Sequence, residues 1–228
     1  MDNNGIFYGV GVGTGDPEYL TLKAVRLIQQ ADVIAYLKSN QGITIAYDIA
    51  SKWITDQQQL IIPMPYKTDR KAANQAYNTA AEEIANYLRQ GLQVAFLCEG
   101  DPLFFGSYIY LHQRLSLHYK CEIVAGISSI NAATALAQIP LVEQNQTLAV
   151  LTSRNSDNEI LNALDEYSSV VIMKAGIDRP RLLELLRQSH RLEYSCYIER
   201  AGQEGEKIIY DLRRLRGKGD YFSLFIVY

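Results

Sequence analysis

The chain has 228 residues, of which 48% are hydrophobic and 21% charged, and its formal net charge at pH 7 is −3. This length can fill one large domain or two small ones, and the acidic balance argues against general binding of nucleic acids. The first residues lack the pattern of a signal peptide, and no uninterrupted apolar run is long enough to cross a bilayer, so we expect a cytoplasmic protein.

The N-terminal half alternates strand and helix patterns, which predicts an α/β fold with largely parallel strands. The predicted strands cover residues 6–12, 33–37, 60–62 and 93–98, and the predicted helices cover residues 20–31, 43–53, 73–88 and a segment around 108–111. Pro63 and Pro65 interrupt the pattern. The polar, basic segment 66–71 that follows them is predicted to be a mobile lid.

A boundary near residues 116–120 divides the chain into expected domains over 1–117 and 118–228. The second half is predicted to contain a helix of small residues over 130–137 and strands over 121–124, 147–152, 169–173, 194–199, 206–210 and 221–227. The last strands leave no room for full helices between them, so this half should carry a mixed or antiparallel sheet.

The cysteines of the chain, Cys98, Cys121 and Cys196, are widely spaced and lie in apolar stretches. Three thiols cannot all pair within one chain, so we expect buried free thiols. The three histidines show no ligand spacing with them, and we therefore expect no metal site.

The sequence Gly-Asp-Pro occurs twice, at residues 15–17 and 100–102, each time soon after an apolar run. Glycine permits unusual backbone angles, aspartate can cap a helix, and proline suits the first helical position. Such turns leave backbone amides at the carboxyl ends of parallel strands, where open α/β sheets bind ligands. Each turn alone is also typical of a plain helix cap, and neither a Gly-x-Gly-x-x-Gly pattern nor a P-loop is present.

Four segments together resemble the tetrapyrrole methylase family, which uses S-adenosylmethionine. They are residues 11–17, 99–106, 126–133 and 199–202, and they follow the family's order and spacing over nearly the whole chain. The resemblance implies two α/β domains, the first facing the tetrapyrrole and carrying a mostly parallel sheet, the second carrying a mixed sheet. It also implies a cofactor in the cleft between the domains and a homodimer. Segments 98–108 and 126–133 are most similar to the branch that methylates the C20 meso carbon during cobalamin synthesis.

Carried over position by position, the family's cofactor contacts fall on turns that follow strands. The implied residues are Thr14, Glu99, Gly100, Asp101, Phe104, Ser128, Ser129, Met173, Lys174, Ala201 and Gly202. Amides and hydroxyls can hold a carboxylate, and Asp101 can attract a positively charged amino group. An ordinary helix N-cap is the alternative for the two serines.

The family's substrates carry acetate and propionate groups, so basic residues should bind them. The candidates are Lys38, Lys67, Arg70, Lys71 and Arg200, and for those in the 66–71 segment the alternative is a solvated surface charge. Methyl transfer from a sulfonium mainly requires alignment and exclusion of water. The sequence contains no nucleophilic triad, and we identify no catalytic residue.

Two positions depart from the wider family. Thr14 stands where many members have proline, and Tyr36-Leu37-Lys38 lacks the carboxylate that the sirohaem-forming branch has at the matching place. Alternatives from the same fold are methylation of another tetrapyrrole carbon, of a modified protein histidine or of a ribosomal RNA ribose, the last disfavoured by the acidic charge. A nucleotide-sensing module without catalysis is a further alternative.

Overall fold

The computed structural model describes residues 4–65 and 70–228. Contacts divide the chain into two compact units, one up to Ser128 and the other from Ser129 to Tyr228. Each unit contains one five-stranded sheet. Among the described residues, no helix combines the length and the apolar character needed to cross a bilayer.

The first unit is built on a parallel sheet with the strand order β3-β2-β4-β1-β5. Its strands are β1 (Phe7–Gly11), β2 (Val33–Ser39), β3 (Gln58–Met64), β4 (Val94–Cys98) and β5 (Cys121–Val124). Its helices are α1 (Leu22–Gln30), α2 (Ile45–Ala50), α3 (Arg70–Arg89) and α4 (Tyr108–Leu115), with short 3₁₀ helices η1 (Pro17–Tyr19) and η2 (Ser51–Trp53).

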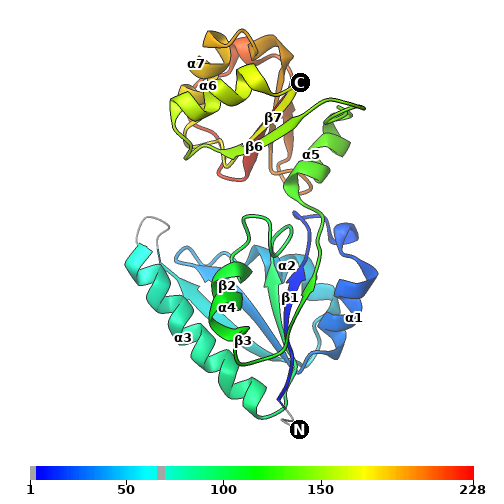
Figure 1. The fold of residues 1–228 in the computed structure, drawn as a ribbon. Helices are drawn as coiled ribbons and strands as arrows, with labels where there is room; N and C mark the ends of the chain where they lie inside the picture. Colours follow the sequence, from blue (N-terminus) through cyan, green and yellow to red (C-terminus); the bar gives the residue numbers. More distant parts are fainter. Residues whose placement is uncertain (1–3, 66–69) are drawn as a thin grey trace. The chain divides into compact units, whose positions relative to one another are not determined.

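Helices cover both faces of this sheet. The apolar stripes of α3 and α4 pack on one face, and those of α1 and α2 pack on the other (Figure 1). Consequently β1 and β4 are buried along their whole length, as strands of a parallel sheet usually are. All strands of the unit point the same way, so their carboxyl ends lie at one edge.

Pro63 does not end the third strand, contrary to the sequence prediction. It lies inside β3 and pairs with Lys38 of β2. β3 lies at the edge of the sheet. Proline has no amide hydrogen, and an edge strand tolerates this because one of its sides makes no hydrogen bonds to a neighbouring strand. The predicted lid begins immediately afterwards, and most of it, including Lys67, lies outside the described residues.

The second unit contains a mixed sheet with the order β6-β7-β10-β8-β9, in which β6 and β7 are parallel and the other pairs are antiparallel. The strands are β6 (Leu148–Thr152), β7 (Ser169–Met173), β8 (Ser195–Glu199), β9 (Lys207–Ile209) and β10 (Ser223–Val227). The parallel first sheet and the mixed second sheet confirm the predicted fold class.

Three helices accompany the second sheet: α5 (Ser129–Ala137), α6 (Asp157–Glu166) and α7 (Arg179–Gln188). The 3₁₀ helices η3 (Leu192–Tyr194) and η4 (Leu212–Arg214) complete the unit. Leucines and isoleucines of α6 and α7 pack with Tyr197 and Phe225 into one core. The sequence analysis did not predict α6, although Ser156 and Glu159 form a complete capping box at its start.

The boundary between the units differs from the one predicted at 117/118. β5 was assigned to the second half, but it pairs with β1 from Phe7↔Cys121 to Val10↔Val124 and so belongs to the first sheet. The polar residues around His118 form a tight turn after α4, in which the His118 amide donates to Leu115 O at 3.0 Å. A turn between two elements of one unit and a linker between units have the same polar composition.

Candidate functional site

The two Gly-Asp-Pro turns meet through their backbones at the carboxyl edge of the first sheet. The Gly100 amide donates to Gly13 O at 2.7 Å, and the Gly13 amide donates to Gly100 O at 3.4 Å. Both glycines have a left-handed backbone, with φ of 79° at Gly13 and 65° at Gly100. Few other residues adopt this conformation without strain, so glycine is required where the turns join.

A close approach of three backbone segments lies beside this junction. A Cβ added to Gly126 would lie 2.0 Å from Gly100 O and 2.8 Å from the Gly11 Cα. By contrast, the nearest atom of the described residues to a Cβ added to Gly100, its chain neighbours aside, would be Ile127 O at 3.9 Å. The backbone is therefore closely packed at Gly11 and Gly126, whereas Gly100 presents an open face.

Asp101 fixes the second turn in place. Its Oδ1 accepts from the Leu103 amide at 2.9 Å, and its Oδ2 accepts from the Gly126 amide at 3.1 Å. No helix begins at Pro102, in contrast to the sequence expectation, because Asp101 closes an Asx turn and the chain reaches α4 only at Tyr108. In the first turn the expectation is confirmed, since Asp16 caps η1 by accepting from the Glu18 amide at 2.8 Å.

The other predicted residues of the first unit lie at or next to the same edge. Thr14 is buried in the first turn, Glu99 is exposed directly after β4, and Ser128 ends the segment that follows β5. Phe104 packs edge-on against Phe105 with ring centroids 5.0 Å apart. Lys38 lies near the carboxyl end of β2, so its strand brings it to this edge as well.

Arg70 and Lys71 do not lie in a loop. They are exposed residues in the first turn of α3, so the helix starts earlier than predicted. Lys67 and the rest of the 66–69 stretch are not among the described residues. The structure thus places two of the basic candidates on a helix and Lys38 on a strand.

In the second unit, the predicted residues gather where β7 and β8 end and β10 begins. The register pairs Met173 with Leu224 and Glu199 with Ser223. The predicted residues at these strand ends are Met173, Lys174, Arg200, Ala201 and Gly202. Ser129 lies elsewhere in the unit, as the first residue of α5. Lys174 and Arg200 have positive φ values of 57° and 54°. Non-glycine residues in this conformation are often found at ligand sites.

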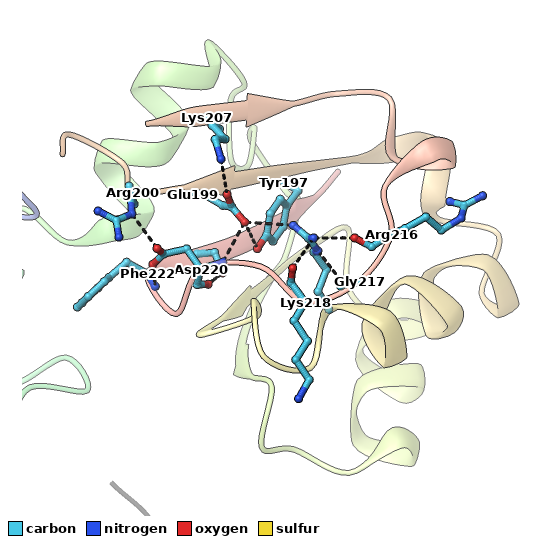
Figure 2. A network of polar contacts seen from close by, with 11 residues as sticks. Tyr197, Glu199, Arg200, Lys207, Arg216, Gly217, Lys218, Asp220 and Phe222 are labelled. Carbon is cyan, nitrogen blue, oxygen red and sulfur yellow. Dashed lines mark hydrogen bonds and ion pairs between the residues drawn. The ribbon is translucent and has the colours of Figure 1, made fainter. Parts of the chain in front are cut away.

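Beside these residues lies a network of buried polar side chains that sequence reasoning missed (Figure 2). Arg179 Nη1 donates to Glu199 Oε1 at 3.1 Å, and both side chains are only 8% exposed. The same oxygen accepts from the Tyr197 hydroxyl at 2.9 Å and the Asp220 amide at 3.0 Å. Burial raises the pKa of Tyr197 to about 12, and its bond to Glu199 acts in the same direction. Tyr197 is therefore a neutral donor at physiological pH.

Arg200, predicted to hold a substrate carboxylate, has a carboxylate partner in its own unit. Its Nε lies 2.7 Å from Asp220 Oδ2, and Figure 2 shows the two side chains facing each other. Its backbone amide donates to Phe222 O at 2.7 Å. Arg200 thus links the end of β8 to the segment before β10, and a substrate carboxylate would have to share its guanidinium with Asp220.

Other features of the chain lie apart from the predicted residues. A surface cavity of about 330 Å³ is lined by Pro180, Leu183, Arg187, Leu192, Arg213, Leu215, Arg216 and Gly217, none of which was predicted as a site residue. Within the described part of the chain, no group of three His, Cys, Asp or Glu side chains could hold a metal ion. All three cysteines are free; Cys98 and Cys196 are buried and Cys121 is partly exposed.

The chain is similar in sequence to known members of one protein family. The family model for Tetrapyrrole (Corrin/Porphyrin) Methylases matches residues 7–215. A protein named precorrin-2 C(20)-methyltransferase from Sinorhizobium sp is 34% identical, and the match covers 98% of this chain and 95% of that protein. Cobalamin biosynthesis protein CobIJ of Mycobacterium tuberculosis is 36% identical over 92% of this chain. That protein is longer, and the match covers only 43% of it.

Solved structures share the fold. The uroporphyrin-III C-methyl transferase of Thermus thermophilus, solved in complex with S-adenyl homocysteine, superposes with a TM-score of 0.67 at 19% identity. The superposition covers 98% of this chain and 97% of that one. At this identity the likeness concerns the fold.

Proposed function

Because this chain belongs to the tetrapyrrole methylase family, we propose that it transfers a methyl group from S-adenosylmethionine to C20 of precorrin-2 or cobalt-precorrin-2 in cobalamin biosynthesis. The observation that carries the proposal is the similarity to a precorrin-2 C(20)-methyltransferase along nearly the full length of both chains. The parallel match to CobIJ concerns less than half of that protein and supports the pathway rather than the position of methylation.

The edge of the first sheet suits the proposed cofactor. Gly100 presents an open face without a side chain, while Asp101, held in place by two backbone amides, puts a negative charge beside it. Hydroxyls of Ser128 and Ser129 follow at the start of α5. Such groups can bind the amino and carboxylate ends of an amino acid. We propose that Lys174, Ala201 and Gly202 of the second unit complete the cofactor site.

In the proposed mechanism, the chain binds and orients both reactants. S-adenosylmethionine, when bound, supplies a methyl group on a sulfonium, which is already a strong electrophile. The fixed turns at Gly100 and Gly126 would hold one reactant rigidly, and the apolar side chains of Leu103, which is exposed, and Phe104 would cover a bound reactant and exclude water from it. Holding two reactants in line at short distance lowers the barrier by several kcal/mol, roughly 7–11 in the best intramolecular cases. We assign no general acid or base.

The substrate side is proposed to be basic. Lys38 and Arg200 lie at the ends of strands, Arg70 and Lys71 lie in the first turn of α3, and Lys67 precedes that helix in the sequence. Cationic side chains there would pair with the acetate and propionate groups of the macrocycle. We also propose that the protein acts as a homodimer, which sedimentation velocity would test by giving twice the chain mass of 25.7 kDa.

Two measurements test this function. Calorimetry should detect binding of S-adenosylhomocysteine to the purified protein, and mass spectrometry should detect one added methyl group on precorrin-2 or cobalt-precorrin-2. Binding without methylation of either tetrapyrrole would support a nucleotide-sensing role instead. Absence of binding would contradict the whole proposal.

A further inference from the structure

We propose that Arg179 is a positioning residue that holds the turn of residues 200–202 in its cofactor-binding shape, acting through the segment 216–222. The inference rests on the proposed function, because it takes that turn as part of the S-adenosylmethionine site. Arg179 itself lies at the start of α7 and is not among the residues expected to touch the cofactor.

Arg179 contacts the segment before β10 through its guanidinium group. Its Nε donates to Gly217 O at 2.9 Å, and its Nη2 donates to Arg216 O at 2.8 Å and to Lys218 O at 2.7 Å (Figure 2). One guanidinium thus satisfies three consecutive carbonyls in a stretch with no strand or helix of its own. A lysine ammonium cannot reproduce this planar set of donors.

The same segment is bonded to the turn of residues 200–202 and to the end of β8. The Asp220 amide donates to Glu199 Oε1 at 3.0 Å, and Asp220 Oδ2 pairs with Arg200 Nε at 2.7 Å. Phe222 O then accepts from the Arg200 amide at 2.7 Å. Arg200 therefore has both its backbone and its side chain held by the segment, immediately before Ala201 and Gly202.

The conformation of Arg200 explains why such support is needed. Its φ of 54° is unfavourable for a residue with a side chain and persists only where the surroundings enforce it. The same segment also contacts the loop that follows β7 and Lys174, since the Gly219 amide donates to Gly176 O at 2.8 Å. Movement of residues 216–222 would thus disturb both groups of proposed cofactor residues in the second unit.

Close packing gives the network little freedom. A Cβ added to Gly219 would lie 2.2 Å from the Tyr197 hydroxyl and 2.4 Å from Glu199 Oε1, so the segment lies directly on these polar groups. Buried ion pairs often add little to stability compared with apolar residues of similar size. The role that fits this arrangement is therefore control of local geometry.

The test compares Arg179→Lys with two controls. Arg187→Lys changes an arginine of the same helix whose carboxylate partner is the exposed Glu184. Ile160→Val slightly destabilises the core of the same unit without removing a polar group of the network. We expect Arg179→Lys to weaken binding of S-adenosylhomocysteine about tenfold, which equals about 1.4 kcal/mol. The KM for S-adenosylmethionine should rise with little change in kcat, and both controls should bind like the parent protein.

Asp220→Ala provides a second variant in case Arg179→Lys does not fold. It removes the carboxylate that pairs with the Arg200 side chain and accepts from the Phe222 amide at 2.9 Å, and it should weaken S-adenosylhomocysteine binding severalfold. Hydrogen exchange without ligand should become faster at residues 199–203 and 216–222 in both variants and stay unchanged in both controls.

The outcomes separate the two proposals. If the parent protein binds S-adenosylhomocysteine and both network variants bind it equally well, the positioning role is contradicted while the function stands. A loss in Arg179→Lys matched by Ile160→Val would also contradict it, because general destabilisation would explain the effect. If the parent protein does not bind S-adenosylhomocysteine, both the proposed function and the role of Arg179 in cofactor binding are contradicted. Hydrogen exchange then still shows whether Arg179 holds the turn of residues 200–202.

Discussion

The Gly126 amide donates to Oδ2 of Asp101 over 3.1 Å and so joins the turn after β4 to the turn after β5. From the sequence, Asp101 was expected to contact the cofactor or to cap a helix, but its carboxylate holds two parts of the fold together. Any ligand that meets Asp101 meets a side chain whose orientation is already fixed. A site prepared in this way loses less conformational entropy on binding.

Replacing Asp101 should affect both stability and binding. We expect Asp101→Ala to lower the free energy of unfolding of the first unit by about 1–3 kcal/mol, because the Leu103 amide and the partly buried Gly126 amide lose a charged acceptor. It should also weaken binding of S-adenosylhomocysteine. Urea denaturation followed by the fluorescence of Trp53, the only tryptophan of the chain, reports on this unit.

Asp16→Ala is the matched control, since Asp16 occupies the same place in the first Gly-Asp-Pro turn but caps only the exposed η1. The loss of stability there should be smaller, at the lower end of the roughly 0.5–2 kcal/mol typical of helix caps. Equal losses in the two variants would show that the bond to Gly126 has no special importance.

Gly100 allows conformation and space to be tested separately. Its φ of 65° suits Asn better than Val, and a new side chain would extend into the open face rather than into the protein. Gly100→Val should therefore destabilise the protein by about 1–2 kcal/mol, and Gly100→Asn by less. Both should weaken S-adenosylhomocysteine binding in calorimetry. Normal binding by either variant would place the cofactor elsewhere.

Lys38 is the basic candidate that lies within a strand of the first sheet. Lys38→Ala should raise the KM for the tetrapyrrole about fivefold, equivalent to about 1 kcal/mol for a partly exposed charge pair, and leave S-adenosylhomocysteine binding unchanged. Lys52→Ala, an exposed change in η2, is the control. If both variants have the same KM as the parent, Lys38 does not hold the substrate.

The stability of the second unit should depend on alkaline pH through Cys196. Burial raises the pKa of this thiol from 9.0 to about 11. Between these values the unfolded chain loses the proton and the folded chain keeps it, so stability is full below pH 9 and falls as pH rises to 11. Cys196→Ala should reduce this fall, measured by urea denaturation with circular dichroism at pH 8.5 and 10.5. An unchanged fall would mean that the thiol titrates normally in the folded protein.

The strands that were predicted best from the sequence are those that are most completely buried. Residues 170–173 and 94–98 are apolar throughout, and the structure places them in β7 and β4, which are buried on both faces. Helix α6 was missed although its capping box is local and readable. The membership of β5 in the first sheet could not be predicted locally, because a parallel strand carries no signal of its partner.

The site was predictable only in part, for a similar reason. The glycine turns are visible as motifs, and the structure joins them at Gly13 and Gly100. Arg179 has no motif around it, and besides Glu199 its partners are carbonyls 37 to 39 residues further along the chain. Backbone acceptors leave no trace in the sequence, so a network of this kind emerges only from the fold.

The position of the transferred methyl group tests the central proposal most directly. The protein should be incubated with precorrin-2 or cobalt-precorrin-2 and S-adenosylmethionine carrying a ¹³C-labelled methyl group, and the product examined by NMR. We predict a single labelled methyl group, attached to C20. A label on a pyrrole carbon would contradict the proposed position while leaving the family unchanged, and no label on either tetrapyrrole would contradict the proposed activity.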